Sequence, residues 1–319
     1  MLGSAIELGR KNAGKYHPRR EEDVNMKLPF FKVSKNEFGK YKVENFNHKG
    51  HDNEPRMDYV TLYLSNQIFP NIDKEVDITG YYNIELHDSF SYLNNSDIVD
   101  YENVLTFGGI KNDKRGILIP DTFMMGNWGN QLQMLNDQIP WTNKTNKIVW
   151  VGTTTGDRDP IKNERIKTCL WALNKKNFCD FYITKIAQMT IEDIMMKIPN
   201  FNDIFRSPIG IPEQMAYRYH LTMDGNASPW NVFEYFTNSL VFKQKSDNIL
   251  WYSPLFKDRE NVVDVDLNNL EQAYYFYGNN PQEANMIIQN MNKFARDVFR
   301  PLTAQQYTVT LFETMGNNR

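Results

Sequence analysis

Residues 148–158 read Ile-Val-Trp-Val-Gly-Thr-Thr-Thr-Gly-Asp-Arg, and this stretch decides the predicted fold. Its four apolar residues predict a buried strand, and the Gly/Thr segment after them predicts a loop. Behind the loop, residues 161–174 predict a helix, because Ile166, Leu170 and Leu173 recur at helical spacing. A strand, a glycine-containing loop and a helix in this order are typical of α/β proteins.

The alternation of strands and helices continues in both directions. Toward the N-terminus, short apolar runs bounded by turn residues predict strands at 60–64, 81–86, 104–107 and 116–119. Toward the C-terminus, strands are predicted at 180–183, 217–223, 240–242 and 261–265. Helices are predicted at 191–198, 230–237, 267–277, 281–299 and 304–314. This alternation predicts parallel sheets that are covered by helices on both faces.

The chain of 319 residues is long enough for two domains of ordinary size. Residues 1–25 show no periodicity and are predicted to be a disordered leader. The polar stretch 138–147 is the candidate linker between two α/β domains, which are expected at 26–143 and 144–300. Residues 301–319 are expected to form a C-terminal helix.

The composition excludes several classes of protein. Apolar residues make up 41% and charged residues 24%, as in globular proteins, and a net charge of −3 argues against a coat for nucleic acid or anionic membranes. Cys169 and Cys179 are too few for a disulfide framework, and no clustered histidines complete a zinc site with them. No run approaches the ~20 apolar residues that span a bilayer. A soluble, cytoplasmic protein is therefore expected.

The first candidate site is the loop after the strand at 148–151. Gly152 and Gly156 let the backbone approach a ligand closely, and Arg158 and the N–H groups at the following helix start favour an anion. Between the glycines lie three hydroxyl groups, those of Thr153, Thr154 and Thr155. The loop matches neither the P-loop pattern nor the dinucleotide fingerprint. A simple turn that joins strand to helix is the competing interpretation.

The second candidate is the run Asp-Gly-Asn-Ala-Ser at 224–228, directly after the strand at 217–223. Asp-Gly is a common turn, yet its place at a carboxyl end of the same predicted sheet is where ligands bind in α/β proteins.

A third candidate lies in the first half, where Glu85 and Asp88 compete as the carboxylate that takes a proton from a hydroxyl group. Solvent exposure without function is the alternative for both. The strand histidines His87 and His220 are interpreted as packed residues, and Asp264 and Asp266 as a solvated strand end.

Taken together, several segments resemble glycosyltransferase family 90, the group of the Rumi-like protein O-glucosyltransferases and capsule xylosyltransferases. The resemblance is clearest in Tyr-His-Leu-Thr-Met-Asp-Gly at 219–225 and Asn-Ser-Leu-Val-Phe-Lys-Gln at 238–244. Residues 150–160 are similar to the family's diphosphate loop, and 84–88 lies where the family carries its catalytic aspartate. The resemblance covers roughly residues 80–315.

This resemblance implies a GT-B fold, in which two Rossmann-like domains face across a cleft and the second holds the donor. It implies inverting, metal-independent transfer of glucose or xylose from UDP-glucose or UDP-xylose to a hydroxyl of a glycan or glycoprotein, with no further cofactor. Asp88 would be the base, and Arg158 would neutralise the departing diphosphate. The donor-binding set would be Gly152, Thr153, Thr154, Thr155, Gly156, Asp224, Gly225, Ser228 and Ser239.

Two departures from the family pattern leave other functions open. Many members carry an Arg where this chain has Pro229-Trp230-Asn231, and a Glu before the aromatic pair where it has Leu250-Trp251-Tyr252. Arg165 is the candidate that would supply the missing charge. The alternatives are a catalytically degenerate glycan-binding module and an enzyme that hydrolyses or epimerises its donor. No signal peptide or retention signal is seen, so a viral or microbial glycan-building enzyme is expected, in the host cytoplasm if viral.

Overall fold

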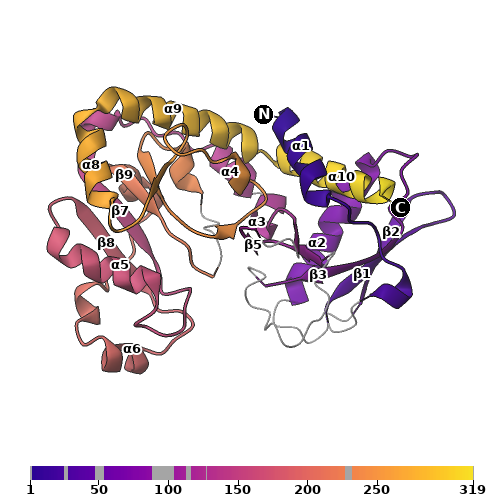
Figure 1. Ribbon diagram of the computed structural model, residues 1–319, viewed down its shortest axis with the longest axis horizontal. Helices are drawn as coiled ribbons and strands as arrows, with labels where there is room; N and C mark the ends of the chain where they lie inside the picture. The colour runs from indigo at the N-terminus through magenta and orange to yellow at the C-terminus, as the bar shows by residue number, and fades with distance from the viewer. Residues whose placement is uncertain are drawn as a thin grey trace. The chain divides into compact units, whose positions relative to one another are not determined.

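The computed structural model describes residues 2–24, 28–46, 54–87, 104–112, 116–126, 128–226 and 232–318. The chain forms two compact units (Figure 1). Unit 1 comprises Met1–Gln133, Asp247–Pro254 and Asp297–Arg319, and unit 2 comprises Met134–Ser246 and Leu255–Arg296. Each unit contains a five-stranded sheet with helices, so the predicted α/β class is confirmed.

Unit 2 is built on a fully parallel sheet. Its strands are β7 (Thr145–Thr153), β8 (Cys179–Lys185), β9 (Tyr217–Thr222), β10 (Leu240–Gln244) and β12 (Val263–Val265). The spatial order is β12-β10-β9-β7-β8, and every neighbouring pair runs parallel. Numbered along the chain, these strands lie in the order 2-1-3-4-5, which is a doubly wound, Rossmann-like topology.

A hydrophobic cluster of unit 2 lies on one face of this sheet. Alternate strand residues such as Ile148, Tyr219 and Phe242 are fully buried there, as the two-residue period of a strand requires. Helices α5 (Glu164–Ala172), α8 (Leu270–Asn279) and α9 (Pro281–Val298) contribute apolar side chains to the same cluster. Ile194 of α6 (Ile191–Lys197) belongs to this cluster as well, and a further short helix of unit 2 is α7 (Ile211–Met215).

Unit 1 has a mixed sheet, where a parallel one was predicted. Its order is β2-β1-β3-β4-β6, and β1 (Phe30–Lys35) runs antiparallel to both of its neighbours, β2 (Tyr41–Phe46) and β3 (Gly80–Glu85). β3, β4 (Val104–Thr106) and β6 (Gly116–Leu118) are parallel. A small second sheet pairs β5 (Gly109–Ile110) with β11 (Asn248–Ile249), and two short helices follow β6, α3 (Thr122–Met125) and α4 (Trp128–Gln133).

The strand predicted at 60–64 is wrong. These residues belong to α2 (Glu54–Tyr63) and the π-helical turn after it (Leu64–Ile68). Met57, Val60 and Leu64 are almost fully buried and recur every three to four residues, which is helical spacing. A short apolar run cannot be assigned to strand or helix without this wider period.

The N-terminal segment is also a correction, because it was predicted to be disordered. Residues Leu2–Ala13 form helix α1, which packs against α10 (Pro301–Asn317) within unit 1 (Figure 1). Gly9 makes the close approach possible, since a Cβ atom there would lie 2.9 Å from the carbonyl oxygen of Tyr307. The N-terminal helix α1 and the C-terminal helix α10 therefore both belong to unit 1.

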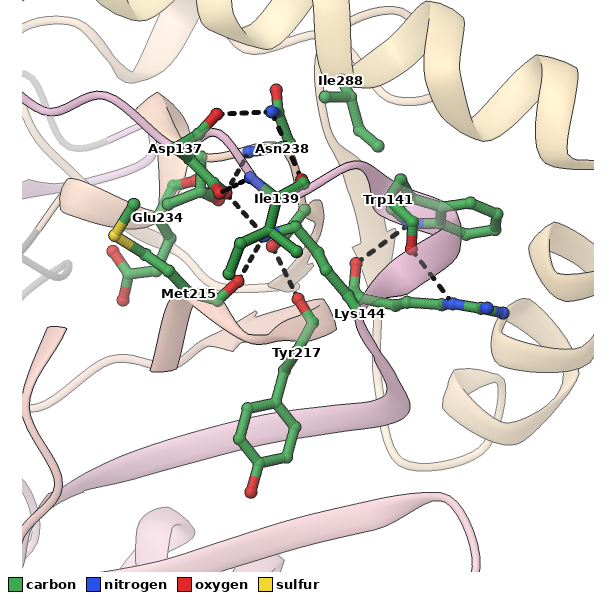
Figure 2. Close-up of polar contacts among 12 residues, drawn as sticks. Asp137, Ile139, Trp141, Lys144, Met215, Tyr217, Glu234, Asn238 and Ile288 are labelled. Carbon is green, nitrogen blue, oxygen red and sulfur yellow. Dashed lines mark hydrogen bonds and ion pairs between the residues drawn. The ribbon is translucent and has the colours of Figure 1, made fainter. Parts of the chain in front are cut away.

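The predicted linker at 138–147 is part of unit 2 (Figure 2). The ammonium group of Lys144 contacts a carboxylate oxygen of Asp137 at 2.5 Å and the carbonyl of Met215, and both charged side chains are almost fully buried. The same carboxylate oxygen accepts the backbone N–H of Asn238 at 2.7 Å. The chain therefore enters unit 2 at Met134, ten residues before the predicted boundary at 144.

Two buried ionisable groups in unit 2 predict the pH dependence of its stability. Burial, helped by the charge of Lys144, lowers the pKa of His220 from 6.5 to about 3, and burial raises the pKa of Glu234 from 4.5 to about 8. Because only the unfolded state binds the His220 proton, that residue makes stability rise between pH 3 and 6.5. Because only the folded state keeps the Glu234 proton, that residue makes stability fall between pH 4.5 and 8.

The two effects oppose each other in the shared pH range and leave a net fall above it. We expect Glu234→Gln to remove the contribution of this residue to the fall of the unfolding free energy with pH, which is at most about 1.4 kcal/mol per pH unit. Urea unfolding between pH 5 and 8 measures this slope. His17→Gln, at an exposed histidine of unit 1, is the control. Identical pH profiles for wild type and Glu234→Gln would contradict this prediction.

None of the helices in the described part of the chain is long and apolar enough to span a bilayer.

Candidate functional site

The candidate site lies at the carboxyl ends of β7 and β9 in unit 2. The chain proceeds from β7 to its neighbour β8 on one side, and from β9 to its neighbour β10 on the other. Parallel α/β sheets bind ligands beyond the carboxyl ends of their strands at such a reversal of strand order. The loops after β7 and β9 contain the two Gly-containing candidate segments of the sequence.

Arg165, on α5, joins these two loops. Its Nε donates to the carbonyl oxygen of Asp224 at 2.6 Å and its Nη2 to that of Met223 at 3.2 Å. Its Nη1 donates to the hydroxyl of Thr155 at 2.6 Å and to the carbonyl of Thr153 at 3.2 Å. The loops at 152–158 and 224–226 therefore lie together in the structure.

The positive charge of Arg165 is incompletely compensated. All its hydrogen-bond acceptors within the described residues are uncharged carbonyl or hydroxyl oxygens. Burial lowers the pKa of its guanidinium to about 10, even though the Asp224 carboxylate acts in the opposite direction. The group is still protonated at neutral pH, so it is a largely desolvated cation that favours an anion nearby.

The Trp150 ring contacts Arg165, and Gly152 leaves the space that this ring occupies. The guanidinium carbon lies 5.5 Å from the centroid of the Trp150 ring, in a cation–π arrangement. That ring lies over Gly152, where a Cβ atom would be 2.5 Å from the indole. Glycine is therefore required at position 152 by the Trp150 side chain, which occupies the space next to it, and not by the predicted approach of a ligand.

Asn163 and Thr154 fix the shape of the first loop. The Asn163 amide caps α5 by accepting the N–H of Ile166 at 3.1 Å, and it donates to the carbonyls of Thr154 and Asp157, each at 2.9 Å. The Thr154 hydroxyl is buried and bonded to both the N–H and the carbonyl of Ala187 at 2.8 Å. Thr154 therefore holds the loop to the β8 loop, whereas Thr153 and Thr155 are only partly buried.

Gly156 and Gly225 are glycines for identifiable reasons. Gly156 has a φ of +124°, which side-chain-bearing residues rarely adopt. At Gly225 a Cβ atom would lie 2.7 Å from the Thr155 hydroxyl and 2.8 Å from Nη2 of Arg165. Both glycines allow the two loops to meet around the guanidinium.

The end of β10 reaches the same place. The Asp224 N–H donates to the side-chain carbonyl of Gln244 at 3.2 Å, and the Ser246 hydroxyl hydrogen-bonds the Asp224 carboxylate. Asp224 is thus held by the loop that follows the adjacent strand. Loops after β7, β8, β9 and β10 all contribute contacts to this edge of the sheet.

The remaining predicted site residues fall into three groups. Arg158 lies in the first loop and is exposed. Ser239 precedes β10 at the opposite, amino edge of the sheet, and its hydroxyl donates to the carbonyl of Tyr217 at 2.7 Å. Because parallel strands place all their amino ends together, Ser239 is separated from the other donor residues, and the resemblance misplaced it. Asp88 and Ser228 lie outside the described residues.

The other polar motifs of the sequence have local partners. The buried Glu85 carboxylate accepts the backbone N–H of His87 at 2.8 Å and pairs with the ring Nδ1 of the same residue. Asp266 accepts the backbone N–H of Asn268 at 2.8 Å, in the turn that precedes α8. Within the described residues, no group of three or more His, Cys, Asp or Glu side chains has the arrangement of a metal site.

No protein-family model matches the chain, and no curated protein matches it. Among solved structures, TarM is similar at 12% identity over 68% of this chain and 40% of TarM, with a TM-score of 0.41. HepE from Anabaena in complex with UDP-glucose is similar at 16% identity over 50% of this chain and 47% of HepE, with a TM-score of 0.35.

The C-terminal domain of LpcC, a group 1 family glycosyl transferase from Francisella tularensis, is similar at 13% identity and a TM-score of 0.32. The match covers 52% of this chain and 93% of that domain. The chain thus spans less than half the length of TarM and of HepE. Membership of glycosyltransferase family 90 stays a prediction.

Proposed function

We propose that unit 2 binds the diphosphate of a nucleotide sugar at the carboxyl ends of β7 and β9, and that the chain is a UDP-sugar glycosyltransferase. The observation that carries this proposal is Arg165. A half-buried guanidinium with only neutral hydrogen-bond partners lies where a doubly wound sheet binds its ligands. A diphosphate would supply the anionic hydrogen-bond partner that these contacts of Arg165 lack.

The surrounding groups suit phosphate oxygens. Thr153 and Thr155 carry hydroxyl groups within 3.2 Å of each other, and both reach Arg165. Gly156 presents a backbone N–H in a conformation that few other residues tolerate. Arg158 adds a second, exposed cation to the same loop. Hydroxyl and backbone N–H donors around a guanidinium are typical of phosphate recognition.

In the proposed reaction, an acceptor hydroxyl oxygen forms a bond to the anomeric carbon of the sugar. The bond between that carbon and the diphosphate oxygen breaks, and its electron pair leaves with UDP. Arg165 and Arg158 stabilise the charge that develops on the diphosphate. The hydroxyl proton goes to a base, for which the sequence offers Asp88.

The finer assignments belong to the same proposal. The family-90 resemblance supports glucose or xylose as the transferred sugar, inversion at the anomeric carbon, and catalysis without a metal or further cofactor. It also supports a glycan or glycoprotein acceptor. A viral or microbial role in the cytoplasm, or in the host cytoplasm if the chain is viral, belongs to the same proposal.

Calorimetry of the full chain with UDP, UDP-glucose, UDP-xylose and uridine tests the proposal. We expect UDP and at least one UDP-sugar to bind in the presence of EDTA, uridine to bind far more weakly, and UDP to be released from the productive donor. Binding of glycans without any binding of UDP would overturn the proposal and favour the degenerate glycan-binding module.

A further inference from the structure

Two side-chain amides converge on a single backbone donor in the candidate site. The Gly156 N–H points to Oδ1 of Asn226 at 3.0 Å and to Oε1 of Gln188 at 3.2 Å. Asn226 follows β9 and Gln188 follows β8, so three loops meet at this one hydrogen atom. Two acceptor oxygens share one proton, although an amide N–H is normally satisfied by one.

Gln188 has a strained backbone, and the Thr154 hydroxyl fixes the residue next to it. Gln188 has a φ of +67°, in the left-handed region that costs a residue other than glycine of order 1–3 kcal/mol. Its neighbour Ala187 is fixed through both backbone polar groups by the buried Thr154 hydroxyl. The loop therefore aims the Gln188 side chain at Gly156 at an energetic cost. Strain of this kind concentrates at ligand-binding sites.

The chemistry of these two side chains allows a change of role. An Asn or Gln amide accepts through its oxygen and donates through its NH₂ group, and rotation about the last torsion exchanges the two. An anionic oxygen that takes the Gly156 N–H removes the need for an amide acceptor there. The same rotation would then turn both NH₂ groups toward the anion, beside the Arg165 and Thr155 donors.

We propose that Gln188 and Asn226 are specificity residues for a diphosphate, which accept from Gly156 and rotate to donate to a phosphate oxygen that replaces them. This inference rests on the proposed function, since it assigns two more residues to the same anion. It predicts that the amides recognise phosphate groups and contribute nothing to the binding of the nucleoside. Neither residue belongs to the set that the sequence assigned to the donor.

Binding of UDP, inorganic pyrophosphate and uridine to Gln188→Met and Gln188→Gly tests the inference. We expect both variants to bind UDP and pyrophosphate about three- to tenfold more weakly, because one neutral donor to a charged group is lost. Uridine binding should not change. Gln188→Gly should keep or raise the melting temperature, since glycine relieves the left-handed φ, so weaker binding would not reflect misfolding.

Gln214→Met, on α7 before the amino end of β9, is the matched control and should bind as wild type does. In ¹H–¹⁵N spectra, the Gln188 side-chain NH₂ resonances, identified by their loss in Gln188→Met, should shift on addition of pyrophosphate. Unchanged or tighter pyrophosphate binding by Gln188→Met would overturn the inference alone. Failure of the wild-type chain to bind either UDP or pyrophosphate would overturn the proposed function and this inference together.

Discussion

Replacing Arg165 with methionine is expected to weaken UDP binding by about a hundredfold or more, because the substitution removes a desolvated cation next to the diphosphate. The same change leaves the carbonyls of Asp224 and Met223 without their donor. Each unsatisfied carbonyl costs about 1–3 kcal/mol, so the free energy of unfolding should fall by about 2–6 kcal/mol in total. Calorimetry and urea unfolding measure the two effects separately.

Lysine at position 165 and glutamine at position 158 sharpen this experiment. Arg165→Lys keeps the charge but cannot reproduce the fork of donors that reaches both loops, so it should lose most of the binding. Arg158→Gln removes an exposed cation, so it should leave stability within about 0.5 kcal/mol and weaken UDP less than Arg165→Met does. Full UDP affinity in Arg165→Met would show that the guanidinium only holds the loops together.

The second large effect is expected at the buried pair of Lys144 and Asp137 (Figure 2). Lys144→Met should lower the free energy of unfolding by about 3–5 kcal/mol, because it leaves the Asp137 carboxylate buried without its cation. Burial lowers the pKa of Lys144, so the charged form of this side chain depends on the Asp137 carboxylate for compensation. Urea unfolding of the variant measures the loss.

A double-mutant cycle with Asp137→Asn separates this pair from its surroundings. The asparagine carries no charge and keeps one of the two oxygens, so it can accept from the N–H of Ile139 or from that of Asn238, which bind different oxygens of Asp137. The double variant should therefore be more stable than the sum of the single losses implies, by about 1–3 kcal/mol. Lys167→Met, at an exposed pair with Glu164, is the control and should change stability little. Additive losses would contradict the coupling.

The sequence predicts unit 2 well because its strands are short apolar runs that alternate with periodic helices. The same reasoning fails in unit 1, where the exposed half of the hairpin β1–β2 gives weak alternation and α1 combines two glycines with five polar or charged residues. Helix α1 is stabilised by α10, some 300 residues away, and no local pattern contains that contact. Tertiary packing decides both elements.

The site is predicted as far as chain order determines it. Residues that follow parallel strands share one edge, so the loops after β7 and β9 are brought together as expected. Ser239 directly precedes β10, and this position in the chain is enough to place it at the amino edge of the sheet, opposite the site. The central role of Arg165 was not predictable from spacing, because its partners at 153–155 and 223–224 are joined only by the fold. Asn163 did carry a signal, since asparagine before a helix is a common cap.

The interrupted path of the chain has a consequence for synthesis on the ribosome. Unit 1 begins with the first residues but includes residues 297–319, whereas unit 2 needs nothing beyond residue 296. The unit that is started first is therefore completed last. Helix α1 acquires its partner α10 only when residues 301–317 have left the exit tunnel, after all of unit 2 has been made.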